Sequence, residues 1–164
     1  MATVEVTFTP LPAHVRTARL VATAVARRSG VDESLLDEVR LAVGEACSRA
    51  VEAHRKHCPR QPIRVALTDD GERFEVVVTD AAPADVDGGS PERAAAAAAP
   101  AGSNGIASGV APGAGAAGKD GVILQLPAGV GLAVITGLAD HVRISPAGEG
   151  TSIAMSWKRR SVPA

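Results

Sequence analysis

Apolar and polar residues alternate with a period of two in several short stretches of the chain, a pattern typical of β-strands with one buried face. The alternating stretches are residues 3–8, 63–69, 73–80, 142–145 and 151–157. The second and third are joined by a turn that contains Asp70-Gly71, which is a strong hairpin signal. The last two are expected to pair across the turn at residues 146–150, and order is expected from residue 122 onward.

Apolar residues recur every three or four positions in three other segments, as in amphipathic helices. The first helix is expected over Ala13–Arg28, with Gly30 as its stop signal, and Asp32 is placed to cap a second helix that runs to about Lys56. A third helix should begin at the glycine-rich sequence near residue 129. On the second helix one face is apolar and is expected to pack on the sheet: Leu36, Val39, Val43, Ala46 and Ala50.

This order of elements predicts an α+β fold, a two-layer sandwich. Its sheet should be mixed and mostly antiparallel, with about three helices on one face. We expect a single domain over residues 1–164. Residues 84–121 are almost entirely Ala, Gly, Pro and Ser, which favours a flexible insert, and residues 158–164 are expected to be a frayed tail.

Composition excludes several classes of protein. The formal net charge is −1 and aromatic residues make up 2% of the chain, so neither a basic nucleic-acid surface nor a base-stacking platform is expected. The sequence shows no apolar run long enough to span a membrane and no signal-peptide pattern, so we expect a soluble, cytoplasmic protein. Cys47 and Cys58 suggest no disulfide framework, and Cys47 is expected to be a small buried hydrophobe.

A polar stripe on the second helix borders its apolar face. The stripe consists of Glu38, Glu45, Arg49 and Glu52. A carboxylate beside a buried face, next to small residues such as Ala42, is positioned to meet a ligand in a groove. The alternative is structural, because Glu45 and Arg49 are four residues apart and in the favourable order for an exposed ion pair.

Three further features are each weak signals. Asp80 ends an apolar strand, where its carboxylate either starts a turn or accepts a hydrogen bond from an adenine amine. The sequence Gly129-x-Gly131-Leu132 opens a helix, where free backbone N–H groups favour phosphate, although a turn with positive φ explains the glycines equally well. Thr151 follows a glycine at the start of the last strand.

Taken in order, these features resemble the ATP-binding fold of histidine kinases, Hsp90 and type II topoisomerases, and most closely its anti-sigma-factor serine kinase branch. In that family's first motif a glutamate, an asparagine and a histidine follow one another at the spacing of Glu45, Arg49 and His54. The remaining motifs correspond to Asp80, to Gly129, Gly131 and Leu132, and to Gly150 with Thr151. The resemblance covers residues 11–157 and implies that Glu45 is the general base.

The chain departs from the family pattern at two motifs. Arg49 occupies the place of the Mg²⁺-binding asparagine, but guanidinium has only donors and never deprotonates, so ATP remains a candidate cofactor while Mg²⁺ is not expected. We also expect Arg49 to lower the basicity of Glu45. Ala82 and Ala84 replace two glycines of the Asp80 motif, and Lys119 is the remaining candidate for a phosphate contact in the insert.

The resemblance implies an anti-sigma regulator that switches between a sigma factor and an anti-anti-sigma factor. The departures at the two motifs imply weak or no kinase activity. A homodimer is also a candidate assembly, because dimers occur in the family. The first helix, with Arg16, Arg19, Arg27 and Arg28, is a candidate surface for acidic partners. Two alternatives remain: an active ATP-dependent serine/threonine kinase, and a sensor of a different nucleotide. His54, His57 and Cys58 are also a candidate metal cluster, although polar residues are common at helix C-termini.

Overall fold

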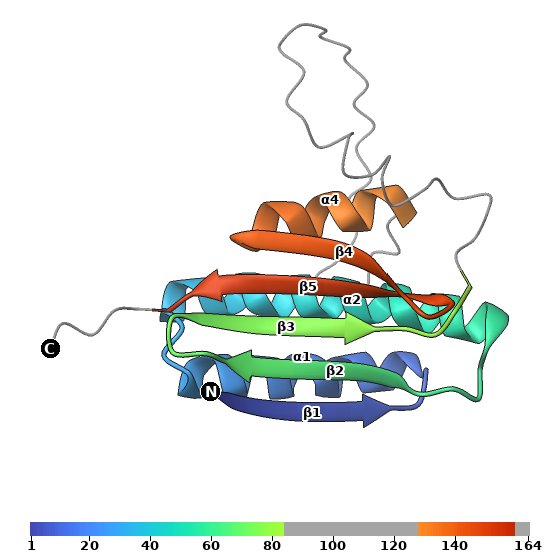
Figure 1. The fold of residues 1–164 in the computed structure, drawn as a ribbon, viewed down its shortest axis with the longest axis horizontal. Coiled ribbons are helices and arrows are strands. Elements are labelled where there is room, and N and C mark those ends of the chain that lie inside the picture. Colours follow the sequence, from blue (N-terminus) through green and yellow to red (C-terminus); the bar gives the residue numbers. More distant parts are fainter. Residues whose placement is uncertain (84–127, 160–164) are drawn as a thin grey trace, which may run out of the picture.

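The structure, a computed structural model, describes residues 1–83 and 128–159. The elements are β1 (Ala2–Phe8), α1 (Pro12–Arg28), the 3₁₀ turn η1 (Glu33–Leu35), α2 (Leu36–His57), β2 (Ile63–Asp69), β3 (Arg73–Thr79), α4 (Ala128–Leu138), β4 (His141–Ala147) and β5 (Gly150–Lys158). Figure 1 labels the strands and the α-helices. The expected α+β class and the expected order of strands and helices are confirmed.

The five strands form one sheet in the order β1-β2-β3-β5-β4. Every pairing among the described strands is antiparallel, so this part of the chain contains none of the parallel pairing that a mixed sheet would have. Because β5 pairs with β3 in the antiparallel direction, its first residues lie beside the last residues of β3, with Ser152 opposite Thr79. This register brings Asp80 next to Thr151, although 71 residues separate them in the sequence.

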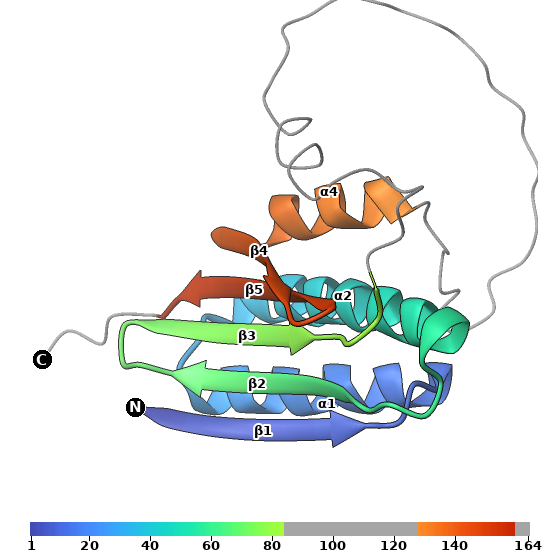
Figure 2. The ribbon, with the colours of Figure 1, turned by 45° about the vertical axis from the view of Figure 1, so that its right-hand side comes forward.

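The three α-helices cover one face of the sheet, as expected for a two-layer sandwich (Figures 1 and 2). Helix α2 is the central one, because it packs against α1 on one side and against α4 on the other. Among the described residues, no helix combines the length and apolar character needed to cross a bilayer.

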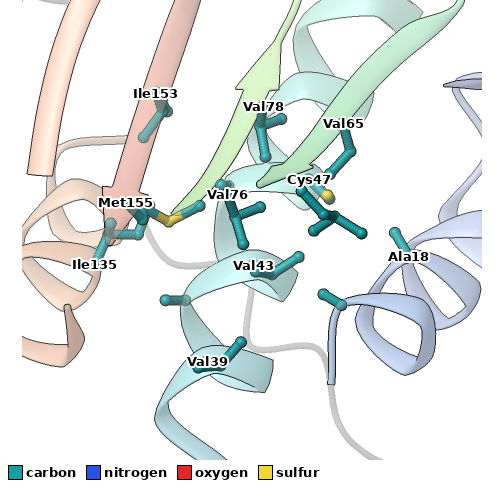
Figure 3. Close-up of a cluster of buried hydrophobic side chains, with 14 of the residues drawn as sticks. Ala18, Val39, Val43, Cys47, Val65, Val76, Val78, Ile135, Ile153 and Met155 are labelled. Atoms are coloured by element: carbon teal, nitrogen blue, oxygen red, sulfur yellow. The ribbon is translucent and has the colours of Figure 1, made fainter. Parts of the chain in front are cut away.

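The core lies between the helices and the sheet (Figure 3). The alternating strands place Val65, Val76 and Val78 toward the helices, and all five residues expected on the apolar face of α2 are buried. Helix α2 is buried on more than one side, because Ala42 and Cys47 are also fully buried. Burial raises the pKa of the Cys47 thiol to about 12, which confirms this residue as a small buried hydrophobe.

The predicted stop signal of α1 is confirmed. The predicted cap Asp32 serves the 3₁₀ turn before α2 and not α2 itself, whose N-cap is Leu35. Helix α1 ends at Arg28, and Gly30 follows with a φ of +83°, a conformation that favours glycine. The Asp32 carboxylate accepts a hydrogen bond of 3.0 Å from the backbone N–H of Ser34, and so it caps the 3₁₀ turn that leads into α2. The β2–β3 turn has Gly71 at a φ of +97°.

Three predicted boundaries differ from the structure or lie outside it. The turn expected over residues 146–150 is shorter, because β4 continues to Ala147 and β5 begins at Gly150. Residues 158 and 159, expected to belong to a frayed tail, are held in place, because Lys158 belongs to β5 and Arg159 donates to the Asp69 carboxylate and to a backbone carbonyl of the hairpin turn. The insert at 84–121, the segment 122–127 and residues 160–164 lie outside the described residues.

Candidate functional site

Glu45 of α2 lies against Gly131 in the first turn of α4. A Cβ atom at Gly131 would clash with the Glu45 carboxylate, so only a glycine allows this approach. Among the described residues the glycines with positive φ are Gly30, Gly71 and Gly148, and Gly131 is helical. The alternative that Gly131 is needed for a turn with positive φ is therefore wrong, and close contact with Glu45 is the reason for the glycine.

Partial burial dominates the electrostatics of Glu45. Desolvation raises the pKa of the Glu45 carboxyl, while the positive charge of Arg49 lowers it to a smaller extent. Arg49 therefore has the effect expected of it, and burial outweighs that effect. Neither Glu45 nor Arg49 is fully exposed. The two residues therefore differ from the exposed surface ion pair that the sequence offered as an alternative to a ligand site.

The Arg49 guanidinium is surrounded by acidic groups. It interacts electrostatically with Glu45, Asp80 and Glu52, in that order of strength, while burial lowers its pKa. The three carboxylates come from α2 and from the end of β3, so Arg49 links these two elements electrostatically.

The family resemblance implies a Mg²⁺ ion at this place, and Arg49 does not fit it. Guanidinium has no lone pair to offer a metal, and its charge repels a divalent cation. The described residues contain no group of three or more His, Cys, Asp and Glu side chains that could hold a metal ion.

Asp80 lies at the other end of the site. Its Oδ1 accepts hydrogen bonds from the backbone N–H of Ala82 at 3.1 Å and of Thr151 at 3.2 Å. The bond to Ala82 closes a turn, which confirms the structural interpretation of this aspartate. Oδ2 accepts no hydrogen bond from a described residue, so its capacity to bind a base amine remains a prediction.

Gly150 fixes the position of this turn. A Cβ atom at Gly150 would clash with the backbone carbonyl of Asp80 and lie 2.7 Å from the Cα atom of Ala81. The backbone N–H of Asp80 also donates to the Thr151 carbonyl at 2.9 Å. The sequence placed Asp80 in one motif and Gly150 with Thr151 in another, and the structure brings all three residues together.

His54 contributes to the same turn, which the sequence analysis did not foresee. The imidazole is completely buried, its Nδ1 lies 2.9 Å from the carbonyl oxygen of Gln61, and its Nε2 lies 2.9 Å from the backbone N of Ala81. Both ring nitrogens therefore have backbone partners, which argues against a metal site shared with His57 and Cys58. The available signal was spacing, since His54 follows Ala50 by four residues on the apolar face of α2.

These contacts define two clusters. We call Asp80, Gly150, Thr151 and His54 the strand-end cluster, and Glu45, Arg49 and Gly131 the helix-face cluster. Asp80 and Arg49 interact electrostatically, so the two clusters adjoin. Burial is the main cause that raises the pKa of Asp80, and its hydrogen bonds and nearby positive charges lower it again in part.

The other predicted site residues do not belong to either cluster. Leu132 is partly buried and packs against the core, and Gly129 is the second residue of α4. Ala82, which stands where the family has a glycine, is buried, so its methyl group is accommodated by the turn. Ala84 and Lys119 lie outside the described residues.

Two arginines of α1 are already engaged within the fold. Arg19 packs over Gly44 of α2, where a side chain on the glycine would meet the arginine stem. Arg27 forms an ion pair of 2.9 Å with Glu33. Arg16, Arg27 and Arg28 are exposed, and the candidate surface for acidic partners stays a prediction.

Comparison with known proteins agrees with this architecture. The family model described as a histidine kinase-like ATPase domain matches residues 8–157. A crystal structure of the RsbU and RsbW domains of Rv1364c from Mycobacterium tuberculosis has a similar fold, with a TM-score of 0.58 and 20% sequence identity. The match covers 100% of this chain, which spans 34% of that one. No curated protein matches the sequence. The family match, which extends over nearly the whole chain, shows that this protein belongs to the histidine kinase-like ATPase domain family.

Proposed function

We propose that the chain is an anti-sigma factor-type regulator that binds a sigma factor and an anti-anti-sigma protein by partner switching. In this proposal its nucleotide site is degenerate and has weak or no kinase activity. The family membership implies an ATP site, and the order of the Glu45, Asp80, Gly131 and Thr151 motifs supports the anti-sigma branch. The likeness in fold to the structure of the RsbU and RsbW domains of Rv1364c is consistent with this branch.

The observation that carries the proposal is the position of Arg49. Its guanidinium lies within electrostatic reach of Glu45, Asp80 and Glu52, where the family places a metal-binding asparagine. Phosphoryl transfer depends on metal ions that neutralise charge on the transferring group. With a fixed side-chain cation among its carboxylates, the site lacks the side chain that would bind the metal ion. We therefore infer that the chain has kept protein binding and has lost phosphoryl transfer.

Phosphotransfer to a candidate anti-anti-sigma protein tests the enzymatic half of the proposal. The protein is incubated with Mg²⁺ and labelled ATP, and Glu45→Gln serves as the matched variant because it keeps the size of the side chain. We expect no phosphoprotein above the background of Glu45→Gln. Robust turnover that Glu45→Gln abolishes would contradict the degenerate site.

A capture experiment with the sigma factors of the source cell tests the binding half. We expect one sigma factor to be retained by the protein and to be displaced by an anti-anti-sigma protein. Failure to retain any sigma factor or antagonist would contradict the partner-switching proposal, whatever the nucleotide experiments show.

One observation favours an active serine/threonine kinase as the second candidate. Burial raises the pKa of Glu45, and a raised pKa suits a general base better than that of an exposed glutamate does. In this alternative Arg49 contacts the phosphates directly in place of a metal ion. The phosphotransfer assay separates the two candidates, because turnover that depends on Glu45 is expected only if the chain is an active kinase.

A further inference from the structure

We propose that β1 is an interaction surface that pairs with β1 of a second copy of this chain. The two strands run antiparallel about a two-fold axis at Val6, and they join the two sheets into one. The inference does not rest on the proposed function, because β1 belongs neither to the helix-face cluster nor to the strand-end cluster.

The outer edge of β1 is open to another strand. Among the described strands β1 pairs with β2 alone, so one row of its backbone N–H and C=O groups has no strand beside it in this part of the chain. Helix α1 lies behind β1 and β2 and does not extend past β1, so it leaves room at this edge (Figures 1 and 2). Such a row of backbone groups is a template for the addition of a strand.

Strand β1 also lacks the features that commonly protect an edge strand. Its seven residues are in continuous register with β2, without a bulge, and they include neither proline nor lysine. Its one charged residue, Glu5, forms an ion pair of 3.1 Å with Arg64 of β2. The opposite edge strand, β4, contains both Arg143 and Pro146. Of the two edges of the sheet, β1 is therefore the one that is suited to pairing.

The apolar side chains of β1 that face the helices are incompletely covered. Val4 is 42% exposed, while Val6 and Phe8 are partly buried. A pocket of about 430 Å³ lies beside the second half of the strand, and its lining includes Val6, Phe8, Ala18 of α1 and Pro62. One end of β1 thus exposes an apolar side chain, and the other end borders an apolar pocket.

A two-fold axis at Val6 brings these two ends together. Val4 of each copy then lies opposite Phe8 of the other copy, beside the pocket. The same register places Glu5 opposite Thr7, whereas an axis at Glu5 would oppose two like charges. Axes at Val4 or Thr7 would leave Phe8 or Val4, respectively, without a partner. The axis at Val6 is therefore the register that the side chains favour.

Sedimentation of the full chain at increasing concentration tests whether the pairing occurs. One short pair of strands with two apolar contacts makes a small interface, so we expect a reversible dimer with a dissociation constant on the order of 10 to 100 μM. A chain that remains monomeric at about 1 mM, ten times the upper figure, would overturn the proposal.

Two lysine variants test whether β1 forms the interface. Val4→Lys places a charge at the open edge and should weaken dimerisation at least about tenfold, which corresponds to about 1.4 kcal/mol. Leu41→Lys is the matched control, because Leu41 lies on α2 and is 52% exposed, and this variant should dimerise like the unmodified protein. Unchanged dimerisation of Val4→Lys, or an equal loss in both variants, would contradict pairing through β1.

Nuclear magnetic resonance tests the register without any substitution, and it decides the proposal even if Val4→Lys does not fold. Within one strand Val4 and Phe8 are four residues apart, or about 13 Å, so they cannot be in contact in a single chain. In a mixture of isotope-labelled and unlabelled protein we expect a nuclear Overhauser effect between the Val4 methyl groups of one copy and the Phe8 ring of the other. A dimer that lacks this contact would show that the copies do not pair about Val6.

Discussion

The two clusters of the candidate site are built in different ways. In the strand-end cluster, backbone groups contact backbone groups, because the Asp80 turn is bonded to Thr151 and packed against Gly150. In the helix-face cluster, side chains meet one another across α2 and α4, with the Glu45 carboxylate against Gly131 and Arg49 among several acids. The first cluster includes the motif residues Gly150, Thr151 and His54, although Ala82 stands in place of a motif glycine in the same turn, and the second cluster carries Arg49 in place of the motif asparagine.

This difference indicates which part of the site tolerates substitution of side chains. Backbone contacts cannot move without disturbing the sheet, so the strand-end cluster is constrained by stability as well as by any ligand. Side chains on a helix surface can be replaced while the helix stays in place, so chemistry at the helix-face cluster can be lost and the surface retained. Three predictions test this contrast, in order of decreasing effect.

The largest effect is expected for Gly150→Ala. The added methyl group meets the backbone of Asp80 and Ala81, which cannot turn aside, so we expect a loss of about 3 kcal/mol in the free energy of unfolding. Gly137→Ala is the control, because a side chain there meets nothing within 4 Å and should stabilise α4 by up to about 1 kcal/mol. Urea unfolding of both variants measures the difference, and a loss below about 1 kcal/mol for Gly150→Ala would contradict the backbone clash.

A smaller effect is expected for Gly131→Ala, because the obstacle is the end of a flexible side chain. The gain in helix propensity, about 1 kcal/mol, should be offset by displacement of the Glu45 carboxylate. In a Glu45→Ala background the same change should stabilise the protein by about 1 kcal/mol, which gives a coupling energy of about 1 kcal/mol. Additive effects in this double-mutant cycle would show that the two residues do not meet.

The smallest effect concerns the pH dependence of stability at Glu45. Burial raises the pKa of Glu45 above its usual value of 4.5, so the favourable contribution of this group to stability is complete at acidic pH and is lost as pH rises through the folded-state pKa. The unmodified protein should therefore lose stability relative to Glu45→Gln as pH rises above 4.5. Urea unfolding of both proteins across this range measures the gap, and a gap that changes in the opposite direction would mean that Arg49 dominates over burial.

Much of the fold was predictable from local patterns. Period-two alternation located both hairpins, and the spacing of apolar residues on α2 identified its buried face, because each pattern reflects contact with one core. The boundaries near the C-terminus were less accurate. Proline at 146 reads as a turn residue, yet it lies in the edge strand β4, where one side of the backbone needs no partner.

The site was predictable as a set of residues but not as a set of contacts. Sequence spacing identified Glu45, Arg49, Asp80 and Gly131, yet it did not indicate that Gly131 makes room for Glu45. Nor did it show that burial outweighs Arg49 in setting the pKa of Glu45. His54 was read as a motif residue or a metal ligand because its partners, Gln61 and Ala81, are backbone groups that leave no trace in the sequence.

The most direct test of the central claim, that Arg49 takes the place of the metal ion, is the ATP affinity with and without Mg²⁺. Calorimetry should be carried out on the unmodified protein, on Arg49→Asn and on Arg55→Asn, which removes an exposed arginine of the same helix. We expect Mg²⁺ to leave ATP binding unchanged in the unmodified protein and in Arg55→Asn, and to strengthen it by about tenfold or more in Arg49→Asn. Mg²⁺-dependent binding of ATP by the unmodified protein, with no gain in Arg49→Asn, would contradict the claim.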